Sequence, residues 1–196
     1  MEISRDILNS NHEANAAVIM NPQVEDDLMI LGTFHVECLD KDGNIKWEED
    51  FPNTVVTVGK NYMLESGLAA SALTTVGPYM GLISLASFSA ISAADTMASH
   101  AGWLEAGVAN APTYTIPRKT CVFGAAAAGV KALSAALSFA ITGTGTIKGC
   151  FIVTGVGALT TIGNTAGTLL SAGLFTGGDR AVLSGDTVNV SYSLAL

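Results

Sequence analysis

Apolar residues recur at every second position along several stretches of the chain. Between residues 28 and 38 these alternate positions hold Ile30, Gly32, Phe34, Val36 and Cys38. A period of two places successive side chains on opposite faces of a sheet, so this stretch predicts a strand with one buried face. Residues 187–194 repeat the pattern and predict a strand near the end of the chain.

Further short strands are predicted by alternation or by β-branched and aromatic content. We expect them at residues 44–49, 54–58, 79–86, 120–123, 130–133, 136–141, 146–153, 167–175 and 181–183. One helix is expected at 61–70, where Asn61 can cap the first turn and apolar residues follow at helical spacing. Phe51-Pro52-Asn53 is expected to separate two strands, because proline cannot donate a ladder hydrogen bond.

The segment Asp40-Lys41-Asp42-Gly43-Asn44 lies between the first two expected strands. Its Asp-x-Asp-Gly order faintly resembles a calcium loop, but the ligand spacing is wrong and no bidentate Glu closes a twelve-residue loop. Asp and Asn tolerate left-handed backbone, and Gly adopts it without steric cost. We therefore predict a hairpin turn.

Many short strands, one helix and Gly-rich turns predict a mainly β fold. We expect an antiparallel β-sandwich or jelly-roll-like domain over residues 28–196, with one short helix and an extended N-terminal arm over residues 1–27. Strands and helices do not alternate as a nucleotide-binding α/β domain requires. The arm is polar and aperiodic, so alone it buries too little apolar area to order itself. We expect it either to lie on a neighbouring subunit or to form a disordered tail.

The net charge of −8 lies entirely within residues 1–60, and residues 61–196 are balanced. Acidic surface repels phosphates, so we expect no nucleic-acid partner. Charged residues make up only 13% of the chain and the mean hydropathy is +0.43, which fits either a membrane protein or a subunit buried against neighbours. The most apolar stretch, 123–142, is interrupted by Lys131 and consists largely of Ala and Gly. We favour the subunit and expect no membrane partner.

The start of the chain lacks the basic residues and apolar run of a secretory signal. Cys38, Cys121 and Cys150 are far apart and odd in number, and none forms a Cys-x-x-Cys pair. We expect three buried, reduced thiols with no disulfide and no zinc site.

Residues 95–103 combine an Asp, a Ser and a His, the residue types of a nucleophilic hydrolase. Ser99 and His100 are adjacent, however, and neighbouring side chains point apart in a helix or a strand. No Gly-x-Ser-x-Gly elbow surrounds Ser99. His100 with Asp95 and Glu105 is the only local cluster that could hold a metal. We instead expect Asp95 to cap a turn, Ser99 or His100 to bond backbone, and Trp103 to be a buried anchor.

Five segments occur in a fixed order: 43–47, 53–60, 95–103 with Glu105, 145–149 and 185–190. In this order they resemble a group of small tailed-bacteriophage virion proteins, described as structural and sometimes as capsid-associated or tail-fibre proteins. The resemblance covers roughly residues 32–194 and leaves the arm outside. It implies a virion subunit and no catalyst.

The resemblance, together with a weakly charged body, leads us to expect a capsid decoration (cement) protein in the virion, assembled in the host cytoplasm. Its expected partners are the major capsid protein and copies of itself, as a dimer or trimer. The alternative is a tail or head fibre component that attaches to the host. We expect no catalytic, cofactor-binding or metal-binding residues, and a hydrolase acting on host surface polymer is the third possibility.

Overall fold

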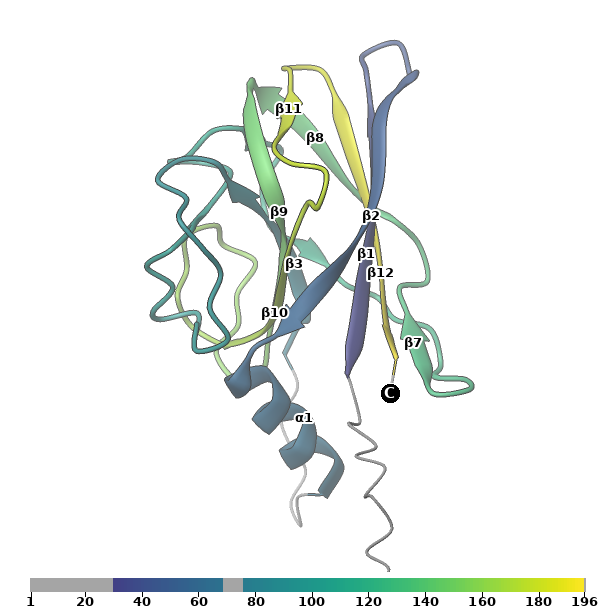
Figure 1. The fold of residues 1–196 in the computed structure, drawn as a ribbon, viewed down its shortest axis with the longest axis vertical. Helices are drawn as coiled ribbons and strands as arrows, with labels where there is room; N and C mark the ends of the chain where they lie inside the picture. The colour runs from purple at the N-terminus through teal and green to yellow at the C-terminus, as the bar shows by residue number, and fades with distance from the viewer. Residues whose placement is uncertain (1–29, 69–75, 196) are drawn as a thin grey trace, which may run out of the picture.

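The computed structural model describes residues 30–68 and 76–195. In this part of the chain, twelve strands form a curled antiparallel sheet, which is accompanied by one helix (Figure 1). The elements in chain order are β1 (Leu31–Leu39), β2 (Ile45–Val55), α1 (Thr57–Leu68), β3 (Tyr79–Ser84), β4 (Leu104–Glu105), β5 (Thr113–Tyr114), β6 (Lys119–Thr120), β7 (Val130–Ala132), β8 (Leu137–Gly143), β9 (Gly145–Thr154), β10 (Thr168–Leu174), β11 (Arg180–Val182) and β12 (Thr187–Ala195). The predicted mainly β, antiparallel fold with one helix is confirmed. The predicted arm, residues 1–27, lies outside the described residues.

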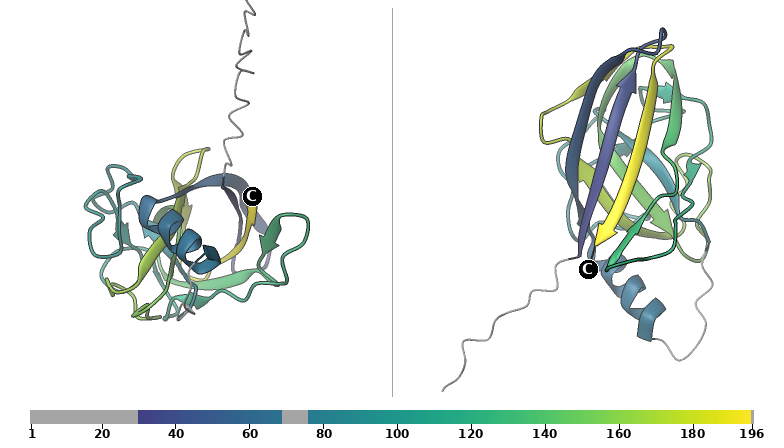
Figure 2. Two further views of the ribbon diagram at one scale, coloured as in Figure 1. Left: turned by 90° about the horizontal axis from the view of Figure 1, so that it is seen from below. Right: turned by 90° about the vertical axis from the view of Figure 1, so that its right-hand side faces the viewer.

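The strands follow one another across the sheet in the order β4-β3-β9-β10-β2-β1-β12-β8-β5. Three short strands pair beside this path, β11 with β9, β6 with β3 and β7 with β12. Seen from below, the sheet curls around an interior and α1 lies across this end (Figure 2). Strand β5 was not predicted, because residues 109–117 were expected to form a loop. The strand expected at 120–123 is displaced to β6.

Strand β2 belongs to both halves of the curl. It pairs with β1 as far as Pro52, which lies opposite Thr33, and then pairs with β10 from Asn53 onward. The prediction that Pro52 breaks the strand is wrong, because proline sits where the strand exchanges one partner for another and no donor is required. Asn53 completes the exchange: its Oδ1 accepts the Gly32 N–H at 2.9 Å and its Nδ2 donates to the Tyr192 hydroxyl at 2.8 Å.

Helix α1 begins at Thr57, four residues before the predicted start, so the strand predicted at 54–58 ends within β2 at Val55. The β-branched run misled the prediction because local propensity favours a strand there. Tertiary packing favours a helix there instead. A Cβ on Gly59 would lie 2.1 Å from the Leu170 carbonyl oxygen, so glycine lets the first turn of the helix approach the β10 backbone. No helix within residues 30–68 and 76–195 is long and apolar enough to cross a membrane.

Apolar side chains form two cores, one on each face of strand β9. Ile147, Cys150 and Ile152 belong to the interior core, which is enclosed by the curl. Phe151 and Val153 point to the other face and pack with Trp103 in a second core. The second core is covered by residues 85–103 and 155–167, which lie over the outer face of β3, β9 and β10 (Figure 1). The sheet is therefore coated by loops on one side.

The predicted hairpin joins β1 and β2. Asp40 Oδ1 accepts the N–H groups of Asp42 and Asn44, both at 2.9 Å, and Gly43 has a φ of +85°. The backbone hydrogen bond from Asn44 is the largest of the effects that lower the pKa of Asp40 below its usual value. The Asp40 carboxylate, part of the pattern that resembled a calcium loop, thus stabilises the hairpin turn.

The three cysteines are free and buried, as predicted. Burial raises the pKa of Cys121 to about 12 and, together with the nearby Asp186 carboxylate, raises that of Cys38 to about 12. Burial also raises the pKa of Cys150. These thiols are therefore protonated and poorly nucleophilic at neutral pH.

The half-buried carboxylate of Glu49 ties β2 to the turn between β10 and β11. Glu49 Oε1 accepts the N–H groups of Thr176 and Gly177 at 2.6 and 2.7 Å, and Oε2 accepts the Arg180 Nε–H at 3.0 Å. Burial alone would raise the pKa of Glu49, but these hydrogen bonds outweigh it and lower the pKa below its usual value. The charged form of Glu49 therefore stabilises the fold.

We predict that Glu49→Gln lowers the free energy of unfolding by about 1–3 kcal/mol at neutral pH, because a charged acceptor is lost from several donors. Since the folded-state pKa is lowered, this contribution is complete above the ordinary value of 4.5 and is lost as the pH falls through the folded-state pKa. Urea unfolding should show that the difference in the free energy of unfolding between wild type and variant becomes smaller as the pH falls below 4.5. The exposed Glu48→Gln serves as control. A difference in the free energy of unfolding that does not change with pH would contradict the role assigned to Glu49.

Candidate functional site

Trp103 anchors the stretch that first suggested catalysis. Its side chain is fully buried, and its Nε1–H donates to Asp95 Oδ2 at 2.9 Å. The His100 ring stacks on the indole at a centroid distance of 3.9 Å, and its Nδ1–H donates to the Trp103 carbonyl at 3.0 Å. Trp103 is thus the buried anchor that was predicted, and His100 bonds backbone.

Asp95 closes the turn that precedes it, and Thr96 caps the turn that follows. Asp95 Oδ2 accepts the N–H of Ser92, three residues earlier, whereas the Ser99 N–H is accepted by Thr96 Oγ1. The Asp95 carboxylate thus joins the preceding turn to the indole. Within the described residues, no hydrogen bond joins this carboxylate to the His100 ring, as a catalytic Asp–His pair would require.

The structure does not bring together the hydrolase or metal groups that the sequence offered. Within residues 76–195, the His100 and Ser99 side chains share no hydrogen bond, and Glu105 is paired with Arg118 instead. In the part of the chain that the structure describes, no group of three His, Cys, Asp or Glu side chains is placed to hold a metal. His100 and Glu105 both lie beside the pocket described below.

Glu105 and Arg118 form a buried ion pair that sequence analysis missed. Arg118 is 1% exposed and donates from Nε and Nη2 to the two Glu105 oxygens at 2.8 and 2.7 Å. The guanidinium also donates to the carbonyl oxygens of Leu159 and Asn164, and Glu105 Oε2 accepts the Gly163 N–H at 2.7 Å. The available signal was the uncharged run of residues 106–117 between these two opposite charges.

The ion pair fastens together two segments, residues 85–118 and 155–167, that we call the loop face. The formally charged residues of the loop face are Asp95, Glu105 and Arg118, and all three are buried. Several of its aliphatic side chains are exposed by a third or more of their surface: Leu85, Leu104, Val108, Ile116, Val156 and Leu159. A pocket of about 390 Å³ opens between the two segments, with Val108 and Ile162 among its walls. The loop face is thus a surface without exposed formal charge.

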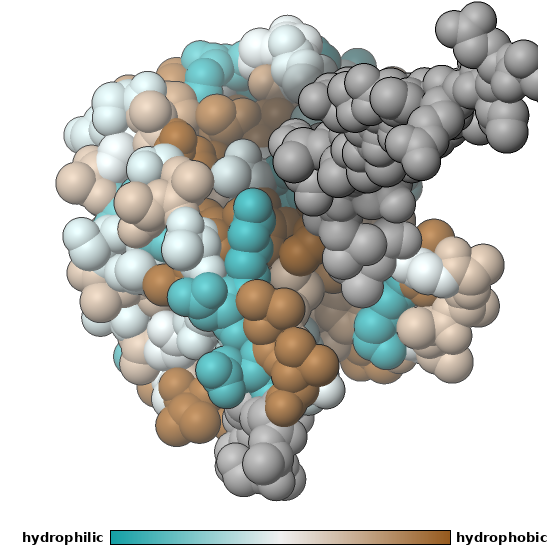
Figure 3. Space-filling model, turned by 60° about the horizontal axis from the view of Figure 1, so that its bottom comes forward, coloured by the Kyte–Doolittle hydropathy of each residue, from teal (hydrophilic) through white to brown (hydrophobic). Residues whose placement is uncertain are grey.

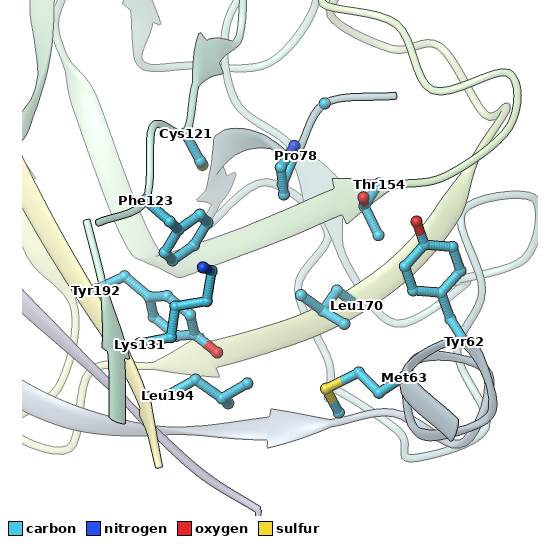
Figure 4. Close-up of a pocket in the computed structure, with 11 residues that line it drawn as sticks. Tyr62, Met63, Pro78, Cys121, Phe123, Lys131, Thr154, Leu170, Tyr192 and Leu194 are labelled. Atoms are coloured by element: carbon cyan, nitrogen blue, oxygen red, sulfur yellow. The ribbon is translucent and has the colours of Figure 1, made fainter. Parts of the chain in front are cut away.

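A second pocket, of about 380 Å³, lies at the end of the curl beside α1 (Figure 4). Met63 reaches it from α1, Leu170 from β10, and Tyr192 and Leu194 from β12. Among the described residues that line it, Lys131 is the one charged side chain. Burial raises the pKa of Tyr192 to about 12, so its hydroxyl stays neutral. We call this apolar concavity the lower pocket.

We predict that Asp95→Ala lowers the free energy of unfolding by about 1–3 kcal/mol, because the buried Trp103 N–H loses its acceptor. Ser99→Ala should change it by no more than about 0.5 kcal/mol, since the exposed hydroxyl is not needed for the fold. Chemical denaturation followed by tryptophan fluorescence measures both. Equal stability of Asp95→Ala and wild type would show that the Trp103 bond does not hold this turn.

Comparisons of the chain with protein-family models, with curated protein sequences and with solved structures gave no match. The loop face and the lower pocket are therefore interpreted from their own chemistry.

Proposed function

We propose that the chain is a structural virion protein of a tailed bacteriophage, a decoration protein that binds the outer lattice of major capsid subunits through its loop face. The ordered resemblance of five segments over residues 32–194 supports a virion role. The single structural observation that carries the proposal is the loop face, whose exposed surface combines aliphatic side chains with Ser and Thr and bears no formal charge.

A surface of this composition suits burial against protein. The cores of protein interfaces are depleted of charged residues, and clustered exposed aliphatic side chains mark interaction sites. Val108 and Val156 are 68% and 71% exposed, one from each segment of the loop face. A specific interface buries about 800 Å² on each partner.

The loop face is held rigid before any partner binds. The buried Glu105–Arg118 pair and the backbone bonds around it fix both segments to the second core. Ordering loops on association reduces affinity, so a surface already ordered loses less on binding. A protein that binds many equivalent lattice sites therefore loses less conformational entropy at each site.

The opposite side of the sheet differs in character. The outward residues of β1 and β2 include His35, Glu48 and Asp50, which are exposed, and the His35 Nδ1–H donates to Asp50 Oδ1 at 2.8 Å. Ionised side chains are well solvated and costly to bury. In the proposed arrangement this polar side faces solvent and the loop face meets the shell.

We predict that Val108→Glu reduces the number of copies bound per phage head about tenfold or more, because a buried unpaired carboxylate opposes the interface. Ile45→Glu, a matched change of an exposed aliphatic residue outside the loop face, should leave occupancy unchanged. Quantitative gel analysis of purified heads incubated with each variant measures occupancy. Full occupancy by Val108→Glu, with the fold intact by circular dichroism, would exclude the loop face as the capsid contact.

A further inference from the structure

The lower pocket is lined by apolar groups that the described chain leaves uncovered. Helix α1 buries only Gly59, so Met63 is half-buried and Leu64 and Leu68 are 59% and 81% exposed. Helices normally bury an apolar stripe against their own domain. Apolar side chains gather at this end of the molecule (Figure 3). An apolar segment from elsewhere would complete the packing around α1.

The N-terminal part of the chain joins the domain beside this pocket. Gly32 in β1 lies directly opposite Leu194 in β12, and Leu194 forms part of the pocket wall. Ten extended residues span at most about 33–36 Å. Residues 21–30 are therefore long enough to bring the preceding segment back to the pocket of the same chain.

Residues 1–29 contain one suitable apolar segment. Ala16-Ala17-Val18-Ile19-Met20 is their longest uninterrupted apolar run. It is flanked by acids, with Glu13 before it and Glu25 to Asp27 after it. Lys131, which lines the pocket, is cationic, so the acidic flanks and this side of the pocket are complementary in charge.

We propose that residues 16–20 bind in the lower pocket of the same chain, with Val18, Ile19 and Met20 packing against Met63 and Leu170. The short connection to β1 holds this segment near its site at an effective concentration of about the millimolar range. A neighbour's segment would have to compete with that concentration. This inference is independent of the virion proposal and differs from the expectation that the arm lies on a neighbouring subunit.

Cysteine trapping in the full-length protein tests the inference. Val18→Cys is combined with Met63→Cys in a Cys121→Ala background, because Cys121 also lines the pocket. The control pairs Val18→Cys with Ser138→Cys, which is exposed on the outer face of β8. We expect the disulfide between positions 18 and 63 to form about tenfold faster or more, since a disulfide requires Cα atoms within about 7 Å. Mass spectrometry under non-reducing conditions should find it within one chain.

A polar substitution within residues 16–20 then distinguishes binding of this segment in the lower pocket from chance encounters of two cysteines on one chain. Ile19→Asp should reduce the rate of the 18–63 disulfide to that of the control pair, whereas Val24→Asp, outside the apolar run, should leave it unchanged. Equal rates for the two cysteine pairs would overturn the inference. A disulfide found mainly between two chains would also overturn it, because the occupant would then be the arm of a second copy.

Discussion

The buried ion pair between Glu105 and Arg118 is the interaction on which the arrangement of the loop face depends. Its two charges are withdrawn from water and satisfied by each other and by the backbone of residues 159–164. Replacing such a pair with apolar residues is often neutral for stability, but removing one partner is severely destabilising. The pair therefore acts chiefly as a geometric constraint. It fixes the two segments of the loop face in one arrangement, and the loop face exists because these segments are fixed.

The curl of the sheet depends on a second constraint, the exchange of partners along β2. Pro52 lies where β2 leaves β1, and Asn53 supplies the acceptor that the Gly32 N–H would otherwise lack. The same region sets the start of β1 against the end of β12, beside the lower pocket. One local arrangement thus closes the interior core and positions the N-terminal part of the chain next to an apolar concavity.

The sequence predicted the strands whose pattern is local and missed the features set by tertiary contacts. Period-two alternation found β1, β9, β10 and β12, and turn residues found the hairpin at Asp40–Asn44. Propensity failed at Thr57, because a helix there depends on the close approach of Gly59 to Leu170. The anchor role of Trp103 was predicted, but the Glu105–Arg118 pair was not, since thirteen residues separate the partners and no spacing rule joins them.

The proposed virion role is tested most directly by a three-dimensional reconstruction of phage particles assembled with this chain. The proposal predicts density at hundreds of equivalent positions across the head lattice, with the loop face against the shell. Density confined to the tail or a single vertex, or contact through the polar side of β1 and β2, would contradict it.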